Sequence, residues 1–182
     1  MATSTDSFDI RPETSADHEA IRDVVAAAFG SDVEAQLVDR IRASPEYVAD
    51  LALVACSDGE VVGHVMVSGA VIRSIRGDRR IAMLSPLAVD PDHQRRGIGG
   101  ALVRAVVAAA DDRGEPLVVL EGSPAYYGRF GFEHSLRYGI EIALPDWAPP
   151  EAAQVIRLGS FDPDDPTLRG SVVYPAAFAG LE

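Results

Sequence analysis

The chain has 182 residues, of which 47% are hydrophobic, and this suits one globular domain with a sizeable core. Its formal net charge of -12 argues against a nucleic-acid-binding protein, because such a protein needs a basic surface. An acidic field attracts cationic ligands instead.

The first nine residues are polar and acidic and show no targeting signal, and the apolar runs are much shorter than a membrane span. We therefore expect a cytoplasmic protein that does not bind a membrane. Cys56 is the single cysteine, so an intrachain disulfide is impossible, and its apolar neighbours indicate a buried thiol. We expect no metal site.

The first third of the chain predicts two helices between short strands. Apolar residues recur at helical spacing from residue 21 to residue 41, with a break at Gly30 and a stop at Pro45. The dipeptide Asp58-Gly59 indicates a hairpin turn between two apolar runs. The expected elements are a strand at 8–11, helices at about 17–29 and 31–44, and strands at 51–56 and 61–68.

The middle of the chain predicts a strand-helix-strand unit. An apolar strand at 81–89 is followed by a helix at 97–113 and a wholly apolar strand at 117–120. This connection is long enough for a right-handed crossover between parallel strands, and ligands of such units lie beyond the carboxyl ends of the strands. A short helix from Ser123 and late strands at 138–144 and 155–158 complete the prediction.

The loop at that edge has the composition of a phosphate site. Gly97, Gly99 and Gly100 stand at the helix start, where free backbone amides and the helix dipole attract anions. Arg95 and Arg96 add positive charge. The alternative is an ordinary turn with solvated arginines.

Two other phosphate sites fit the loop less well. A Walker loop is excluded, because no Lys-Ser/Thr follows the glycines. A dinucleotide site would use Glu121 as its ribose-binding acid, but Leu102 replaces its third glycine and a seven-residue loop separates the glycines from the strand. A nucleotide-binding oxidoreductase therefore remains a weaker hypothesis.

Pro86 interrupts the expected strand at 81–89. Proline cannot donate a hydrogen bond to a sheet, so it predicts a bulge or a break, with a simple edge kink as the alternative. A bulge would leave the backbone N–H of Leu87 or Ala88 without a strand partner.

Residues 94–99 (QRRGIG) resemble the Gln/Arg-x-x-Gly-x-Gly/Ala signature of the GCN5-related N-acetyltransferase (GNAT) family. Residues 87–91 resemble that family's lead-in strand, 126–132 (YYGRFGF) resemble its tyrosine-then-Gly-Phe segment, and Gly63-His64 also fits. The resemblance covers residues 51 to about 134. It is closest to a small bacterial subgroup of predicted N-acetyltransferases.

The resemblance implies an α/β (α+β) fold, with a mixed, mostly antiparallel central sheet, helices on both faces and a central parallel strand-helix-strand unit. It implies a single N-acetyltransferase domain over residues 1–182, with a core at about 8–144 and C-terminal strands and loops at 145–182. Acetyl-CoA is the implied acyl donor. Its pyrophosphate would lie on loop amides, and its pantetheine arm would lie beside the backbone of a strand that splays from its neighbour. The implied cofactor-binding residues are Leu87, Ala88, Val89, Gln94, Arg95, Arg96, Gly97, Ile98, Gly99, Gly100, Ala101 and Tyr127.

The resemblance also implies the catalytic groups. Tyr127 precedes Gly131 by four residues, where many family members place the general acid that protonates the leaving thiolate. Tyr126 is the competing choice, although the two would diverge by about 100° on a helix. Glu121 is the candidate base, with His64, His134 or a chain of waters as alternatives.

The acceptor would be a primary amine on a small molecule, peptide or protein. The resemblance implies that it lies between the N-terminal helices and the late strands, with Phe29, Glu34 and Tyr174 as possible walls. The protein would be a monomer or a homodimer. The alternative function is a non-catalytic acyl-CoA-binding or sensor domain of the same fold.

Overall fold

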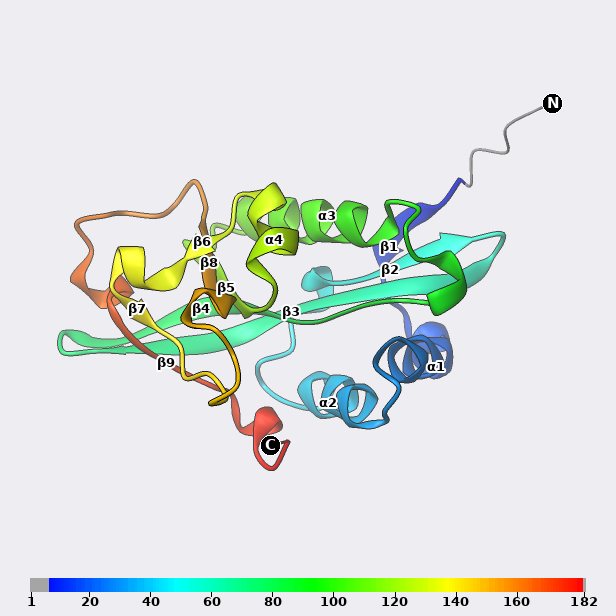
Figure 1. Cartoon of the computed structure of the whole chain (residues 1–182), viewed down its shortest axis with the longest axis horizontal. Helices are drawn as coiled ribbons and strands as arrows, with labels where there is room; N and C mark the ends of the chain where they lie inside the picture. Colours follow the sequence, from blue (N-terminus) through cyan, green and yellow to red (C-terminus); the bar gives the residue numbers. More distant parts are fainter. Residues whose placement is uncertain (1–6, 182) are drawn as a thin grey trace.

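The computed structural model describes residues 7–181, which form a sheet with helices on both faces (Figure 1). Helices α3 and α4 lie over one face, and α1 and α2 lie under the other (Figure 1). The elements are β1 (Asp9–Pro12), α1 (His18–Phe29), α2 (Val33–Arg42), β2 (Ala52–Ser57), β3 (Glu60–Ser74), β4 (Gly77–Val89), α3 (Ile98–Asp112), β5 (Leu117–Glu121), α4 (Pro124–Tyr127), β6 (Glu133–His134), β7 (Ile140–Glu141), β8 (Ala153–Arg157) and β9 (Gly170–Val173).

The strand order is β1-β2-β3-β4-β5-β8-β6, with β9 paired to both β3 and β7. The β4–β5 and β7–β9 pairs are parallel, and all other pairs among the described residues are antiparallel. The predicted mixed, mostly antiparallel sheet with one central parallel crossover is therefore confirmed.

Side chains alternate between the two faces of each strand, so the hydrophobic core is divided between the two faces of the sheet. On the α3 face, Leu102 and Val106 of the helix pack in one cluster with Val65 of β3. Gly63 of β3 makes this approach possible, because a Cβ there would lie 2.9 Å from Leu102 Cδ1. On the opposite face, α1 and α2 pack on residues such as Met66. The close contact at Gly63 holds the start of α3 over the end of β4.

A buried polar network joins α2 and the N-terminal segment to the sheet. Glu13 Oε1 accepts hydrogen bonds from Arg42 Nε at 2.8 Å and from the Tyr47 hydroxyl at 2.9 Å. Its Oε2 lies 2.9 Å from His64 Nε2 on β3. The Glu13 and His64 side chains are only 1% and 0% exposed, so this network replaces water for both.

The predicted bulge at Pro86 is confirmed. Val65 of β3 pairs with Leu87, whereas Val67 pairs with Leu84, so two residues of β4 lie opposite the single residue Met66. Pro86 is one of these two, as expected of a residue that cannot donate to the ladder.

Strands β4 and β5 separate just before this bulge. They pair only at Ala82–Val118 and Met83–Val119. Beyond that point β4 continues to Val89 with β3 as its partner, and β5 continues to Glu121 with β8 as its partner. Within the described residues, the second edge of β4 from Leu84 to Val89 therefore has no strand beside it.

The C-terminal third differs from the predicted elements. The strand expected at 138–144 is reduced to β7, and the strand expected at 155–158 is β8 at Ala153–Arg157. Strands β3 and β4 extend further than expected and pair with each other as far as Ser74–Gly77, and β9 pairs with β3 at Val71–Arg73. The polar residues Asp78 and Arg79 thus belong to a strand through pairing with β3.

Candidate active site

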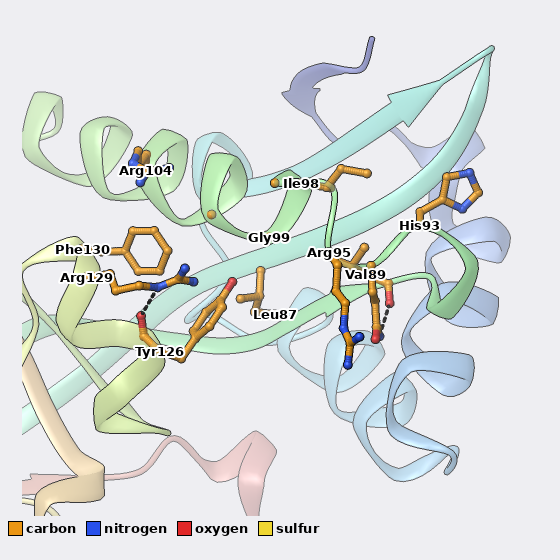
Figure 2. Close-up of a pocket in the computed structure, with 13 residues that line it drawn as sticks. Leu87, Val89, His93, Arg95, Ile98, Gly99, Arg104, Tyr126, Arg129 and Phe130 are labelled. Atoms are coloured by element: carbon orange, nitrogen blue, oxygen red, sulfur yellow. Dashed lines mark hydrogen bonds between the residues drawn. The ribbon is translucent and has the colours of Figure 1, made fainter. Parts of the chain in front are cut away.

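A cavity of about 570 Å³ lies between the end of β4, the start of α3 and the α4 region (Figure 2). Its walls contain eight of the residues expected to bind a cofactor, together with five others. The lining residues are Leu87, Val89, His93, Gln94, Arg95, Gly97, Ile98, Gly99, Gly100, Arg104, Tyr126, Arg129 and Phe130.

The loop before α3 is held in a strained turn. The Gln94 side-chain amide donates to the Val89 carbonyl oxygen at 3.1 Å, which fixes the loop to the end of β4 (Figure 2). Arg95 has a positive φ of 64° and Gly97 one of 84°. A left-handed backbone is uncommon for a residue with a side chain, and such conformations turn successive amides toward one concave side, where they can bind an anion.

The first turn of α3 presents the amides of Ile98, Gly99 and Gly100, which have no carbonyl partner inside the helix. The amide of Ala101 is different, because it already donates to the Gly97 carbonyl oxygen at 3.1 Å. The amides of the helix that have no carbonyl partner inside it therefore end at Gly100.

The glycines of this turn also allow α4 to pack against α3. A Cβ at Gly99 would lie 2.6 Å from the Tyr126 hydroxyl. A Cβ at Gly100 would lie 3.2 Å from Arg104 Nη1 and 3.3 Å from the Phe130 ring. The sequence interpretation explained these glycines by a phosphate alone, and the structure adds a packing reason.

The neighbouring tyrosines point in different directions. Ser123 begins α4 by accepting a hydrogen bond from the Tyr126 amide at 3.3 Å. Tyr126 then lines the cavity, whereas Tyr127 packs into the α3-side core against Phe132, with ring centroids 5.8 Å apart.

Tyr127 nevertheless lies beside the end of β5, beyond Met83–Val119, the last residue pair that joins β4 and β5. Its ring contacts the end of β5 so closely that a Cβ at Gly122 would lie 2.5 Å from it. Burial raises the pKa of Tyr127 to about 12, so its hydroxyl stays protonated at neutral pH.

Four expected cofactor residues, Ala88, Arg96, Ala101 and Tyr127, lie outside the cavity lining. Ala88 is buried and packs on the opposite face with the α1/α2 cluster, so only its backbone is placed toward the strand edge. Arg96 and Ala101 are likewise absent from the lining. Arg95 is the loop arginine that faces the cavity (Figure 2).

Arg104, Arg129 and Phe130 are lining residues that sequence reasoning missed. Arg104 Cζ lies 4.9 Å from the centroid of the Phe130 ring, and Arg129 Cζ lies 4.8 Å from that of Tyr126. The signal for Arg104 was present, because it follows Gly100 by four residues and shares its helix face. No periodicity predicts Arg129, which enters the site from the turn after α4.

Glu121 lies at the carboxyl end of β5, two residues after Val119, and therefore faces away from α3. Burial raises its pKa, and an interaction with the Tyr174 hydroxyl partly opposes this. The Tyr174 hydroxyl donates its one proton to the Ala143 carbonyl oxygen at 3.3 Å, and its ring stacks on Phe178 with the centroids 5.6 Å apart. The structure thus brings together Glu121 and Tyr174, as a candidate base and a candidate acceptor wall.

The other candidate bases are less accessible. His64 is fully buried, and burial lowers its pKa despite the nearby Glu13 carboxylate. His134 is part of β6 and lines a separate cavity near Leu144. Of the other proposed walls, Phe29 is 45% exposed at the end of α1, and Glu34 lies in the first turn of α2.

None of the described helices is long and apolar enough to cross a membrane. Among residues 7–181, no three His, Cys, Asp or Glu side chains are placed to hold a metal ion.

Comparison with known proteins matches residues 9–135 to the family described as "Acetyltransferase (GNAT) domain". The uncharacterized N-acetyltransferase YhbS of Escherichia coli K12 is 33% identical over 150 residues, covering 82% of this chain and 86% of YhbS. The uncharacterized N-acetyltransferase YjhQ of the same organism is 34% identical over 117 residues, covering 64% of this chain and 65% of YjhQ.

Solved structures of GNAT proteins resemble this chain as well. YhbS of Escherichia coli in complex with CoA has a TM-score of 0.78 and 30% identity, over 94% of this chain and 91% of that one. A GNAT family acetyltransferase from Brucella melitensis in complex with acetyl-CoA has a TM-score of 0.75 and 31% identity, over 95% and 99%. Because the family match covers more than half of the chain and a relative above 30% identity covers most of it, the chain belongs to the GNAT family of N-acetyltransferases, as residues 94–99 and 126–132 predicted.

Proposed function

We propose that this protein moves an acetyl group from acetyl-CoA to a primary amine by direct attack in a ternary complex. The observation that supports this most directly is the separation of β4 from β5 beside a cavity whose rim is the start of α3. An open strand edge next to a helix N-terminus suits a ligand with an amide-containing arm and a diphosphate. In this proposal residues 1–182 act as one N-acetyltransferase domain.

Acetyl-CoA would be held at two places, the start of α3 and the open edge of β4. The amides of Ile98, Gly99 and Gly100, with Arg95, would bind the pyrophosphate. The pantetheine arm would pair with the free backbone edge of Leu87, Ala88 and Val89, as an added strand does. Gln94 would act indirectly, because its side chain already fixes the loop to Val89.

The chemistry needs one oxyanion donor, one acid and one base. The neutral amine attacks the thioester carbonyl carbon, so an N–C bond forms and the C–S bond breaks. A backbone N–H near the bulge, from Leu87 or Ala88, would bind the developing oxyanion, a contribution of roughly 3–4 kcal/mol in comparable sites. Tyr127 would give its proton to the departing thiolate, and Glu121 would take the proton of the amine, directly or through water.

The position of Tyr127 supports its role as the acid. Its ring lies against Gly122, just after β5 and beyond the last β4–β5 pair, and its pKa of about 12 keeps the proton on the hydroxyl at neutral pH. Tyr126 instead lies against the first turn of α3, where the pyrophosphate would bind. The two tyrosines would therefore serve different parts of the donor.

The acceptor is proposed to be a cationic amine on a small molecule, peptide or protein. It would approach from the face opposite α3, where Glu121 and Tyr174 interact. The net charge of -12 favours such a ligand.

Calorimetric titration of the purified protein with acetyl-CoA, with NADPH as the control, tests the donor. We expect micromolar binding of acetyl-CoA alone, followed by thiol release when amines are added. Preference for NADPH would contradict the proposal and would favour the oxidoreductase hypothesis.

A second function, acyl-CoA binding without transfer, is favoured by one observation. Among the described residues, the cavity lining holds neither Glu121 nor His134, and its one histidine, His93, lies 3.4 Å from the Asp90 carboxylate. That function predicts acetyl-CoA binding with no thiol release for any amine. Transfer to even one amine rules it out.

A further inference from the structure

We propose that Arg104 and Arg129 form a second phosphate site in the cavity, which recognises the 3′-phosphate of the donor nucleotide and so distinguishes CoA from dephospho-CoA. This inference rests on the proposed function, because it assumes that acetyl-CoA occupies the cavity. It adds a specificity determinant that the loop signature does not contain.

The two arginines belong to one ordered stack, formed by Arg104, Phe130, Arg129 and Tyr126. Arg104 Cζ lies 4.9 Å from the Phe130 centroid, and Arg129 Cζ lies 5.2 Å from it and 4.8 Å from the Tyr126 centroid. The two rings meet edge to face at 5.4 Å. Stacking on a ring uses the flat face of a guanidinium and leaves N–H groups at its edge for a planar or tetrahedral anion.

Neither guanidinium is neutralised by a carboxylate. Across residues 7–181, Arg104 and Arg129 form no ion pair, whereas others such as Arg11, Arg22 and Arg42 bind acidic side chains. Arg129 Nε donates to the Tyr126 carbonyl oxygen at 3.2 Å, which orients the group without compensating its charge (Figure 2). Two uncompensated cations beside one cavity of an acidic chain are suited to an anionic ligand.

This charged pair lies beside the helix N-terminus but is distinct from it. Arg104 Nη1 folds back along α3 to within 3.2 Å of the Cβ position at Gly100. The cavity therefore presents two anion-binding groups: the amides of the first turn with Arg95, and the Arg104/Arg129 pair. CoA carries two matching groups, a diphosphate and a separate phosphate on the ribose.

The alternative assignment is that both arginines bind the diphosphate itself. Arginine edges and helix amides could share one anion, since they lie within the same cavity. The two assignments differ in one measurable respect. Only the 3′-phosphate assignment predicts that the arginines matter for CoA and not for dephospho-CoA.

The experiment is a calorimetric titration of three proteins with CoA and with 3′-dephospho-CoA. The proteins are the wild type, the Arg104→Gln/Arg129→Gln variant and the control variant Arg73→Gln/Arg76→Gln. The control removes the same charge from the end of the β3–β4 hairpin, outside the cavity lining. Arg104 and Arg129 are exposed, so both double variants should fold.

We expect the wild type to bind CoA about 10- to 100-fold more tightly than dephospho-CoA, the range for one charge-assisted hydrogen bond. The Arg104→Gln/Arg129→Gln variant should bind both ligands with the wild-type affinity for dephospho-CoA. The control variant should keep the full wild-type difference in affinity between CoA and dephospho-CoA.

Two results would overturn this inference alone: equal binding of both ligands by the wild type, or an equal loss for both ligands in the Arg104→Gln/Arg129→Gln variant. A control variant that also loses the difference would show a general charge effect, which contradicts it too. If the wild type binds neither ligand, the proposed function fails and this inference fails with it.

Discussion

Replacing Gly99 by alanine tests the proposed anion site with the smallest possible change. The new methyl group would lie 2.6 Å from the Tyr126 hydroxyl and 3.6 Å from Val89 Cγ2. Ordinary contact begins near 3.4 Å, so the Tyr126 hydroxyl must move by roughly 0.8 Å. Tyr126 is only partly buried and belongs to a helix of four residues, so its ring can move.

The structure predicts little change in stability but a clear loss of cofactor binding. Alanine in a helix is favoured over glycine by about 1 kcal/mol, which offsets the cost of moving the ring. The free energy of unfolding should therefore change by less than about 1 kcal/mol. For the cofactor, a methyl group would lie on the surface that a phosphate must approach, and the loss of one charge-assisted hydrogen bond weakens binding roughly 10- to 100-fold.

The assay pairs CoA titration with thermal unfolding, and Gly128→Ala is the matched control. Gly128 has helical backbone angles, and a Cβ there would have no atom within 4 Å, so this variant should keep both its stability and its CoA affinity. CoA binding by Gly99→Ala at the wild-type affinity would refute the assignment of the first turn of α3 as the phosphate site. Equal weakening in both variants would refute it as well.

Three further predictions follow from the ionisable groups. Tyr127→Phe should lower turnover roughly 10²- to 10⁴-fold with little change in acetyl-CoA affinity. If Tyr126→Phe lowered turnover more than Tyr127→Phe, the assignment of the acid would be reversed. Glu121→Gln should lower kcat/KM. Because burial raises the pKa of Glu121, the acid limb of the wild-type pH profile should have its midpoint above the ordinary pKa of 4.5. If the variant keeps the wild-type pH profile, Glu121 is not the base. Burial favours neutral Glu13, but hydrogen bonds from His64 and Arg42 outweigh this and lower its pKa from 4.5 to about 2. The folded state thus gains about 3 kcal/mol above pH 4.5, which is lost as the pH falls toward 2. Glu13→Gln should lower Tm at pH 7 and flatten the fall in Tm over that pH range; a Tm equal to that of the wild type at pH 7 would show that the network adds no stability.

The local parts of the fold could be predicted because each has a local cause. Gly30 takes a positive φ of 66° at the end of α1, and Asp58-Gly59 turns between β2 and β3. Pro86 predicts the bulge in β4, since a missing N–H must disturb a ladder wherever the strand lies. Such effects depend on a residue and its immediate neighbours, so no knowledge of distant segments is needed.

The choice between adjacent residues required the folded chain. Spacing alone placed Tyr126 and Tyr127 on different sides of a helix, and only the packing of α4 on α3 shows which of them lines the cavity. The same packing accounts for Gly99, which accommodates the Tyr126 hydroxyl as well as the free amides of the helix. Arg96 lies outside the lining, although it adjoins Arg95.

The sequence by itself determined the family, the fold class and the position of the glycine-rich loop before α3, because the glycines, the bulge and the apolar runs act over a few residues. Only the tertiary structure decided where β4 leaves β5, that Glu121 meets Tyr174, and that Arg104 and Arg129 share one cavity. Arg104 and Arg129 come from helix α3 and from a turn after α4, separated by all of β5. Their charges act together because long-range packing places them in one cavity, and no spacing along the chain contains that information.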